Sequence, residues 1–172
     1  MKHTLVILFI ILLSSCLPRV RPVKNDYLDP PFQATSTSSK DVVWNKVIDF
    51  FSDKRLSIKN IDKSSGLIIS EKAVFSTTIE DKDGKLVNKS AWVVVPAVYN
   101  PNTKKLESYY TGKVLGEWSI RIKESGKGTI VSVNLVNLKR QFTAYKMGLQ
   151  EVDASFAKST GVFEKQIADL VK

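Results

Sequence analysis

The residue types that most often carry nucleophilic, acid–base or soft-metal chemistry are almost absent from this chain of 172 residues. It has one histidine, His3, and one cysteine, Cys16, and no further copy of either follows. The rest of the chain therefore lacks the commonest general base, the thiol and serine–histidine nucleophiles, and soft-metal ligands. Carboxylates, amines and hydroxyls remain, so we expect a non-enzymatic protein with no metal and no cofactor. A hydrolase that uses a pair of carboxylates is the least favoured alternative.

Cys16 follows an apolar segment that has the features of a secretory signal. Lys2 precedes an almost unbroken apolar run over residues 5–13, which is too short to span a bilayer and has the length of the hydrophobic region of a signal peptide. The motif LSSC, which ends at Cys16, resembles the lipobox of bacterial lipoproteins. The resemblance implies cleavage before Cys16, a diacylglyceryl group on its thiol and an N-acyl group such as palmitate. A free or buried cysteine behind an ordinary signal peptide is the alternative, but no second cysteine is present to pair with it.

The resemblance to lipoproteins also implies a cellular location. Two or more acyl chains hold a protein stably on a membrane, whereas one holds it only marginally. The residue after the lipid site is Leu17, not the aspartate that retains enterobacterial lipoproteins at the inner membrane, and no acidic cluster of the kind linked to surface export follows. We therefore expect a protein that is lipid-anchored at the periplasmic face of an outer membrane.

The charge of the chain is basic but distributed. Loss of residues 1–15 leaves 25 basic and 17 acidic residues, a net charge of +8. No basic run with interleaved aromatic residues appears, so nucleic acid is not an expected partner. Lipid headgroups and envelope glycolipids are the nearer anionic partners.

Residues 16–39 are rich in proline, serine and threonine, and they predict a flexible tether. As a coil its ends would lie about 25 to 30 Å apart, and fully extended it would span roughly 70 Å. Tyr27 and Phe32 are unexpected there, because a linker needs no aromatic side chains. We expect these two residues either to pack back on the domain or to dock on a partner.

Residues 40–172 predict a single folded domain. Its opening residues predict an amphipathic helix capped by Ser38, with apolar side chains at helical spacing. Isoleucine- and valine-rich runs on either side of a turn at 63–66 predict a β-hairpin. Residues 91–98 predict a further strand, in which Pro96 marks an edge or a bulge because it cannot donate a ladder hydrogen bond.

The second half of the domain gives the clearest strand pattern. In GEWSIRIKES, residues 116–125, Trp118, Ile120 and Ile122 alternate with polar side chains, and a turn then leads to a second alternating run. The chain ends in a predicted amphipathic helix capped by Ser159 or Thr160. The predicted class is α+β, an antiparallel β-sheet flanked by an N-terminal and a C-terminal helix that pack on one sheet face, as in a helix-grip fold.

Three local motifs carry a further resemblance. The helix motif DVVWNKVIDFF, the hairpin motif SSGLIISE and the STG before the last helix occur in the order helix, antiparallel strands, helix. This arrangement resembles the BamC-like lipoproteins of the outer-membrane β-barrel assembly machinery, and more closely a set of uncharacterised periplasmic lipoproteins with the same helix-grip plan. BamC has two such domains, whereas this chain has one. The resemblance brings no catalytic residues with it.

Two clusters remain as candidate sites. Glu80, Asp81 and Asp83 precede Gly84, and their spacing lacks the further ligands of a calcium loop, so a hairpin turn is favoured over a metal site. The second cluster is aromatic, and its members fill the core or line an apolar cavity beneath the last helix: Trp92, Tyr99, Tyr109, Tyr110, Trp118 and Phe142. Tyr109 and Tyr110 lie in a polar, loop-like stretch, which indicates partner binding as readily as local packing.

We therefore expect an adaptor or accessory subunit in outer-membrane assembly or maintenance. Cys16 is the predicted lipid site, and Tyr27, Phe32, Tyr109 and Tyr110 are the predicted contacts with another envelope protein. The alternative is a carrier or sensor of an apolar ligand, which would need a cavity within the helix-grip domain.

Overall fold

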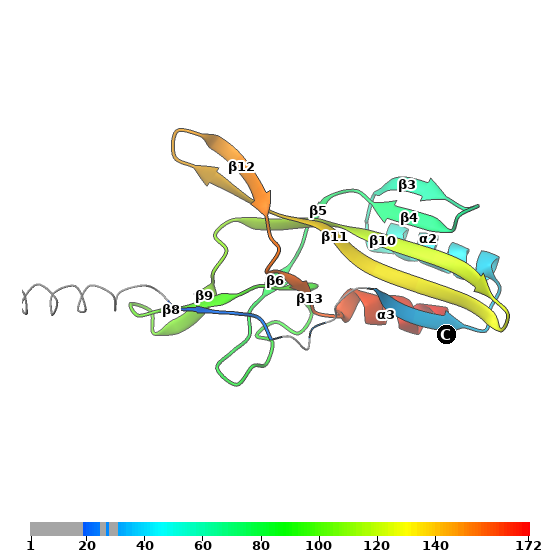
Figure 1. Ribbon diagram of the computed structural model, residues 1–172, viewed down its shortest axis with the longest axis horizontal. Helices are drawn as coiled ribbons and strands as arrows, with labels where there is room; N and C mark the ends of the chain where they lie inside the picture. The colour runs from blue at the N-terminus through cyan, green and yellow to red at the C-terminus, as the bar shows by residue number, and fades with distance from the viewer. Residues whose placement is uncertain (1–18, 25–26, 28–30) are drawn as a thin grey trace, which may run out of the picture.

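The computed structural model of the protein describes residues 19–24, 27 and 31–172 (Figure 1). Its central sheet has the strand order β12-β11-β10-β4-β3, and every pairing in it is antiparallel. The five strands are β3 (Ile58–Asp62), β4 (Leu67–Ser70), β10 (Lys113–Ser125), β11 (Gly128–Ala144) and β12 (Gly148–Asp153). β2 (Phe32–Ser36) pairs with β11, and β5 (Ala73–Val74) pairs with β10.

Two small sheets lie beside the central one. The first has the order β1-β8-β9, from β1 (Val20–Arg21), β8 (Ala97–Asn100) and β9 (Lys105–Ser108). The second has the order β13-β7-β6, from β6 (Thr77–Thr78), β7 (Val93–Val94) and β13 (Lys158–Ser159). The predicted strand over 91–98 is thus two strands that belong to different sheets, because Pro96 interrupts the ladder between them.

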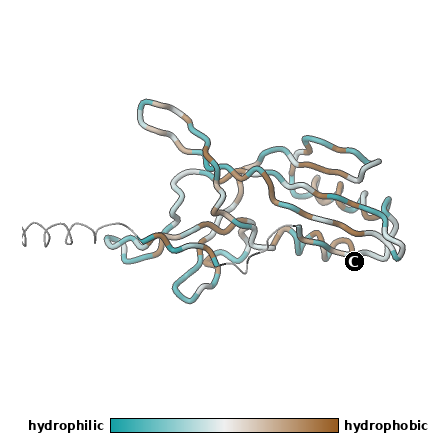
Figure 2. The backbone as a smooth tube through the Cα atoms, in the orientation of Figure 1, coloured by the Kyte–Doolittle hydropathy of each residue, from teal (hydrophilic) through white to brown (hydrophobic). Residues whose placement is uncertain are grey.

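The helices α2 (Lys40–Asp53) and α3 (Val162–Val171) contact each other and the central sheet, α2 through β10 and β11 and α3 through β2 (Figure 1). The structure therefore confirms the predicted α+β class. Among the described residues, neither helix is long and apolar enough to cross a membrane. Hydrophobic residues recur along the central strands and along both helices (Figure 2).

The alternation predicted for residues 116–125 is confirmed in β10. Trp118, Ile120 and Ile122 are fully buried, and Val131 and Val133 continue the buried face on β11. Trp118 stacks on Phe163 of α3, with ring centroids 3.9 Å apart and an angle of 8° between the planes. This stack joins the sheet to the last helix at the centre of the core.

Trp92 and Phe75 complete the aromatic core. Trp92 meets Phe163 edge-on at 5.2 Å and Trp118 at 6.2 Å, and Phe75 lies 5.7 Å from Trp118. Of the two alternatives stated for Trp92 and Trp118, the structure supports packing in the core, because their rings fill the space between sheet and helix by contact with one another and with Phe75 and Phe163.

Both predicted helix caps are displaced. α2 has Ser39, not Ser38, at its N-cap, and the N-cap of α3 is Gly161 with a φ of 82°, one residue beyond Thr160. A left-handed φ favours glycine, so the STG motif marks the turn into the helix rather than a hydroxyl cap. At the other end of α3, Lys46 donates to the carbonyl of Leu170 at 3.0 Å and the Ser36 hydroxyl donates to the carbonyl of Val171.

The boundary between tether and domain also differs from the prediction. β2 lies within the predicted tether, yet Phe32 to Ser36 form ladder pairs with Val133 to Thr129 of β11. β1 lies within it as well, and pairs Val20 with Val98. The folded domain therefore begins well before residue 40. Both strands are stabilised by partners at least 75 residues further along the chain.

Substitution Trp118→Ala tests the central role of the aromatic core. Because the side chain is fully buried and contacts three other rings, we expect a loss of about 3 to 5 kcal/mol in the free energy of unfolding, measured by urea titration at 25 °C. Tyr145→Ala is the matched control, because Tyr145 is 88% exposed and its loss should cost less than about 0.5 kcal/mol. A loss below about 1 kcal/mol for Trp118→Ala would contradict the packing described above.

Candidate interaction surfaces

The structure separates the four predicted partner-binding aromatics. Phe32 lies in β2 and packs against the hydrophobic core. Tyr27 is half-buried, and its hydroxyl donates to Glu80 Oε1 at 2.9 Å. Of the two alternatives stated for this pair, packing back on the domain is the one that the structure supports. Cys16 lies outside the described residues, and its lipidation stays a prediction.

Tyr27 is part of a wider attachment that we call the latch, in which residues 20–24 and 27 lie against the 79–85 segment. Glu80 is 3% exposed, and its second oxygen accepts from the backbone N–H of Lys24 at 3.4 Å. Arg21 donates to the Asp81 carbonyl at 2.7 Å. The Lys24 side chain packs directly on Gly84, and a Cβ atom added to Gly84 would lie only 1.9 Å from Lys24 Nζ. The latch fixes residues 20–24 and 27 against the domain, within the stretch that the sequence predicted to be a flexible tether.

The predicted turn at the acidic cluster is confirmed. Asp81 Oδ1 accepts from the backbone N–H groups of Asp83 and Lys85, both at 2.9 Å, and Gly84 has a φ of 78°. These hydrogen bonds, that from Lys85 foremost, lower the pKa of Asp81. Among the described residues, no group of three or more acidic, histidine or cysteine side chains is placed to hold a metal ion.

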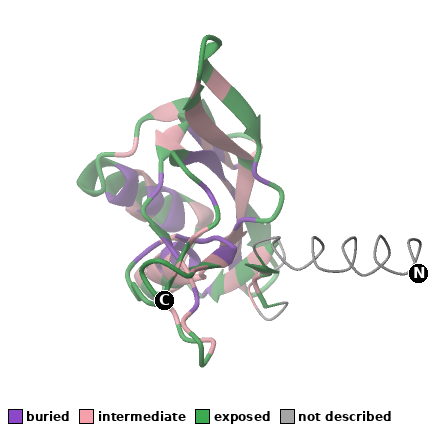
Figure 3. Cartoon of the chain, turned by 90° about the vertical axis from the view of Figure 1, so that its left-hand side faces the viewer, coloured by how far each residue is buried: buried purple, intermediate pink, exposed green. Residues whose placement is uncertain are grey.

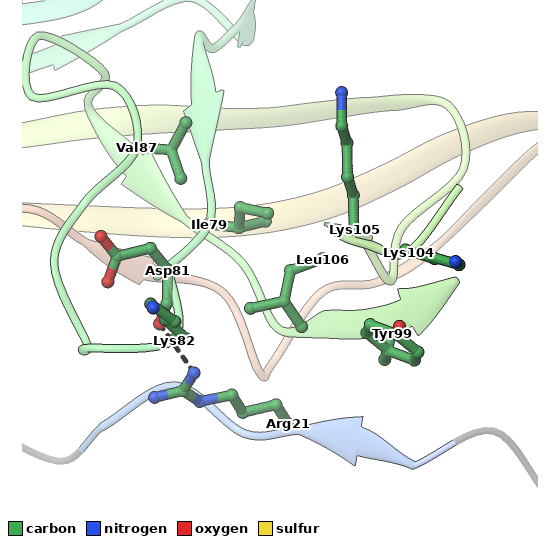
Figure 4. A pocket seen from close by; sticks show the side chains of 9 residues that line it. All are labelled: Arg21, Ile79, Asp81, Lys82, Val87, Tyr99, Lys104, Lys105 and Leu106. Atoms are coloured by element: carbon green, nitrogen blue, oxygen red, sulfur yellow. Dashed lines mark hydrogen bonds between the residues drawn. The ribbon is translucent and has the colours of Figure 1, made fainter. Parts of the chain in front are cut away.

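An open groove of about 540 Å³ lies beside the latch. Its apolar lining comes from Ile79, Val87, Tyr99 and Leu106. Basic side chains stand on either side of this lining, Lys104 and Lys105 of the β8–β9 hairpin on one and Arg21 and Lys82 on the other (Figure 4). The groove is therefore an apolar strip between cationic edges.

Tyr109 and Tyr110 have different environments. Their rings meet edge-on at 5.8 Å, but Tyr109 is 44% exposed whereas Tyr110 is buried. Burial raises the pKa of the Tyr110 hydroxyl. The Arg140 guanidinium lies 5.6 Å from the Tyr110 ring and 4.4 Å from the Phe142 ring, so Tyr110 packs at the point where β11 leaves the sheet. Only Tyr109 of this pair offers a substantial exposed surface.

Beyond this point β11 and β12 project as a two-stranded hairpin, which we call the arm, residues 142–150 (Figure 1). β10 pairs with β11 only as far as Gln141. Within the arm, β11 therefore pairs with β12 alone, from Phe142↔Gln150 to Ala144↔Gly148. Its tip exposes three apolar side chains, Tyr145 at 88%, Met147 at 69% and Leu149 at 63%. The exposed surface of the arm extends away from the body (Figure 3). A projecting hairpin with an apolar tip is a surface suited to binding.

A bulge in the sheet directs the arm outward. The β10–β11 register shifts between Leu115 and Glu117, and opposite it Asn137 takes a φ of 55°. The buried Glu117 carboxylate accepts from Asn137 Nδ2 at 2.8 Å and from Lys59 Nζ at 3.0 Å. Because a bulge bends and twists its strand, this hydrogen-bonded site sets the direction in which the outer part of β11 leaves the core.

Sequence reasoning missed the arm, the latch and the groove. The arm has a local signal, because FTAY and LQEV flank Lys146-Met147-Gly148 with alternating side chains and a turn glycine. For the latch, the aromatic Tyr27 within the tether is a local signal, but nothing in the sequence pairs it with Glu80, which lies 53 residues away. The groove depends on that same long-range contact.

Substitution Glu80→Ala is expected to open the latch. The substitution removes the two carboxylate oxygens that accept from the Tyr27 hydroxyl and from the Lys24 backbone N–H. Each hydrogen bond to a charged group is worth roughly 1.5 to 3 kcal/mol, so the attachment of this segment should weaken. Amide hydrogen exchange at residues 19–24 should therefore become about tenfold faster or more, while exchange in β10 stays unchanged. Glu124→Ala, at an exposed position of β10, is the control. Unchanged exchange at residues 19–24 would show that Glu80 does not hold the segment.

Glu117 gives a pH-dependent prediction. The hydrogen bonds from Asn137 and Lys59 lower the pKa of Glu117 below its usual 4.5. A carboxyl with a lower pKa in the folded state stabilises the fold above its unfolded pKa, and this stabilisation is lost as the pH falls through the folded value. Glu117→Gln should cost about 1 to 3 kcal/mol at pH 7 and less at pH 3, measured by urea titration. Glu124→Gln is the control, and an equal cost at both pH values would rule out this assignment.

Comparison with known proteins adds no family to these observations. No protein-family model matches the chain, and no curated protein matches it.

Proposed function

We propose that this chain is a non-enzymatic lipoprotein of the bacterial envelope, anchored through acyl groups on Cys16 at the periplasmic face of an outer membrane, and that it acts as an adaptor or accessory subunit in outer-membrane assembly or maintenance. The observation that carries the adaptor role is the arm. Three large apolar side chains at its tip are exposed to between 63% and 88%, on a hairpin that leaves the sheet. Exposed aromatic and methionine side chains on a protruding element are typical of interface anchors.

The geometry of the arm indicates how a partner would bind. β12 is the edge strand of the central sheet, so its outer backbone groups are available to pair with an extended segment of another protein. Leu149 and Val152 of β12 are 63% and 41% exposed and would contact that segment. A hairpin of two strands is only marginally stable on its own, and a third strand would stabilise it.

The likeness of the sequence motifs to BamC-like lipoproteins supports the same class of function, namely a subunit that serves an envelope complex without catalysing a reaction. An apolar-ligand carrier receives less support. Trp92, Trp118, Phe75 and Phe163 are packed ring against ring in the position where such a ligand would lie.

The anchor is tested by Cys16→Ser. Without the thiol no diacylglyceryl group can be attached, so the protein should leave the outer-membrane fraction and appear either as a soluble species or as an uncleaved precursor at the inner membrane. Fractionation and immunoblotting of intact cells measure this. A variant that still fractionates with the outer membrane at the size and level of the parent would exclude the lipoprotein assignment.

The adaptor role is tested by crosslinking in intact cells. A photo-reactive phenylalanine derivative at position 145 should give a discrete adduct with another envelope protein, identifiable by mass spectrometry. The substitutions Met147→Ser and Leu149→Ser should each weaken that contact about thirtyfold, since one interface anchor contributes about 2 kcal/mol or more.

The matched control places the same derivative at position 61, because Ile61 is 52% exposed on β3 at the opposite edge of the sheet. Adducts of equal yield from both positions, or no adduct from position 145, would contradict a specific role for the arm. Neither result bears on the anchor.

A further inference from the structure

We infer that the groove beside the latch faces the membrane and binds the anionic headgroups of its lipids. This inference rests on the proposed lipid anchor for its orientation, while the headgroup contacts rest on the groove itself. Three observations support it: the length of chain between Cys16 and the fold, the charge around the groove, and the apolar strip within it.

The first observation is distance along the chain. β1 begins at Val20, four residues after Cys16, and it is paired with β8 of the sheet that forms the groove. A chain advances at most about 3.6 Å per residue, so four residues span at most about 14 Å. A lipid on Cys16 therefore brings the β1-β8-β9 sheet within about 14 Å of the bilayer surface, in contrast to the roughly 70 Å that an extended tether would allow.

The second observation is the charge of the surface that this short connection brings to the membrane. Arg21, Lys82, Lys104 and Lys105 line the groove, against one carboxylate, that of Asp81. That carboxylate accepts two backbone hydrogen bonds within its own turn. Of the four basic residues, the three lysines are exposed, and none of them forms an ion pair with another described residue.

The third observation is the apolar strip between these charges. Val87 is 65% exposed and Tyr99 is 52% exposed, and the side chains of Ile79 and Leu106 lie between these two (Figure 4). A lipid headgroup region offers phosphate groups next to the glycerol and acyl boundary, where tyrosine is favoured. Cationic edges around an apolar strip match that chemistry, whereas a wholly polar anion would leave the strip exposed to water.

The experiment uses the mature chain, residues 16–172, with Cys16→Ser so that no acyl chain contributes. Binding is measured by sedimentation with vesicles of 30% phosphatidylglycerol in phosphatidylcholine, and with vesicles of phosphatidylcholine alone, at 0.15 M salt. Exposed charges further than about 8 Å from the surface are largely screened at that salt concentration. We expect binding to the anionic vesicles that exceeds binding to the neutral ones at least tenfold.

Two matched variants locate the contact. Lys104→Gln with Lys105→Gln removes two charges at the turn of the β8–β9 hairpin, and Lys123→Gln with Lys127→Gln removes two at the turn of the β10–β11 hairpin, which lies at the opposite end of the molecule (Figure 1). Each lysine near an anionic surface contributes about fivefold to the partition coefficient, so the first pair should lower it about 25-fold. The second pair should lower it less than threefold.

Equal losses for the two pairs would mean that the net charge of the protein, not the groove, attracts it to the vesicles, and would overturn the inference. No preference for the anionic vesicles would overturn it as well. Displacement of the protein from vesicles by millimolar glycerol phosphate, with no dependence on Tyr99→Ser, would show a site for a free phosphate rather than for a bilayer lipid. None of these outcomes changes the result expected for the fractionation of Cys16→Ser. The experiments therefore distinguish a failure of the headgroup-binding inference from a failure of the proposed anchor.

Discussion

The stack between Trp118 and Phe163 is the interaction on which the rest of the structure depends. The two rings lie face to face, and they come from the middle of β10 and the first turn of α3, so they fix the last helix against the sheet. Phe50 and Phe51 of α2 meet Phe163 edge-on, which makes the same ring the contact between the helices. β2 then closes the structure, because Ser36 hydrogen-bonds to the carbonyl of Val171 at the end of α3.

A second constraint divides this sheet into a packed part and a projecting part. At the bulge, Gly116 lies so close to the Phe75 ring that a Cβ would stand 2.6 Å from it, and a larger residue would push Phe75 out of the aromatic cluster. The strands on the inner side of the bulge are covered by helices and carry buried apolar residues. On the outer side β11 continues into the arm, which lies away from both helices (Figure 1) and has its apolar side chains exposed. The geometry of one glycine and one buried carboxylate thus separates the core of the protein from its proposed binding surface.

The parts of the fold that the sequence predicted are those whose signal is local. The alternation in residues 116–125 and the turn at 63–66 are decided by side chains within a few positions of one another, and both predictions are confirmed. β2 was predicted as tether because its sequence, FQATS, has little apolar content, and it becomes a strand only through β11, about 95 residues away. The candidate site was harder still. Phe32 and Tyr27 serve to pack the N-terminal strands on the domain. Tyr145, the most exposed aromatic residue of the arm, was not predicted as a contact, because a local sequence pattern does not show which side chains tertiary packing leaves exposed.

The latch changes what an anchor at Cys16 would mean mechanically. A free tether of some twenty residues would let the domain explore a volume well away from the lipid and meet partners by diffusion. With β1 paired to β8 and Glu80 holding Tyr27 and Lys24, only four residues along the chain separate Cys16 from the first strand. A shorter connection confines the domain near the surface and restricts its rotation, which raises the effective concentration of any partner in the same membrane. The arm and the β8–β9 hairpin leave the same half of the molecule in different directions (Figure 1), so one surface can rest on lipid while the other stays accessible to a protein.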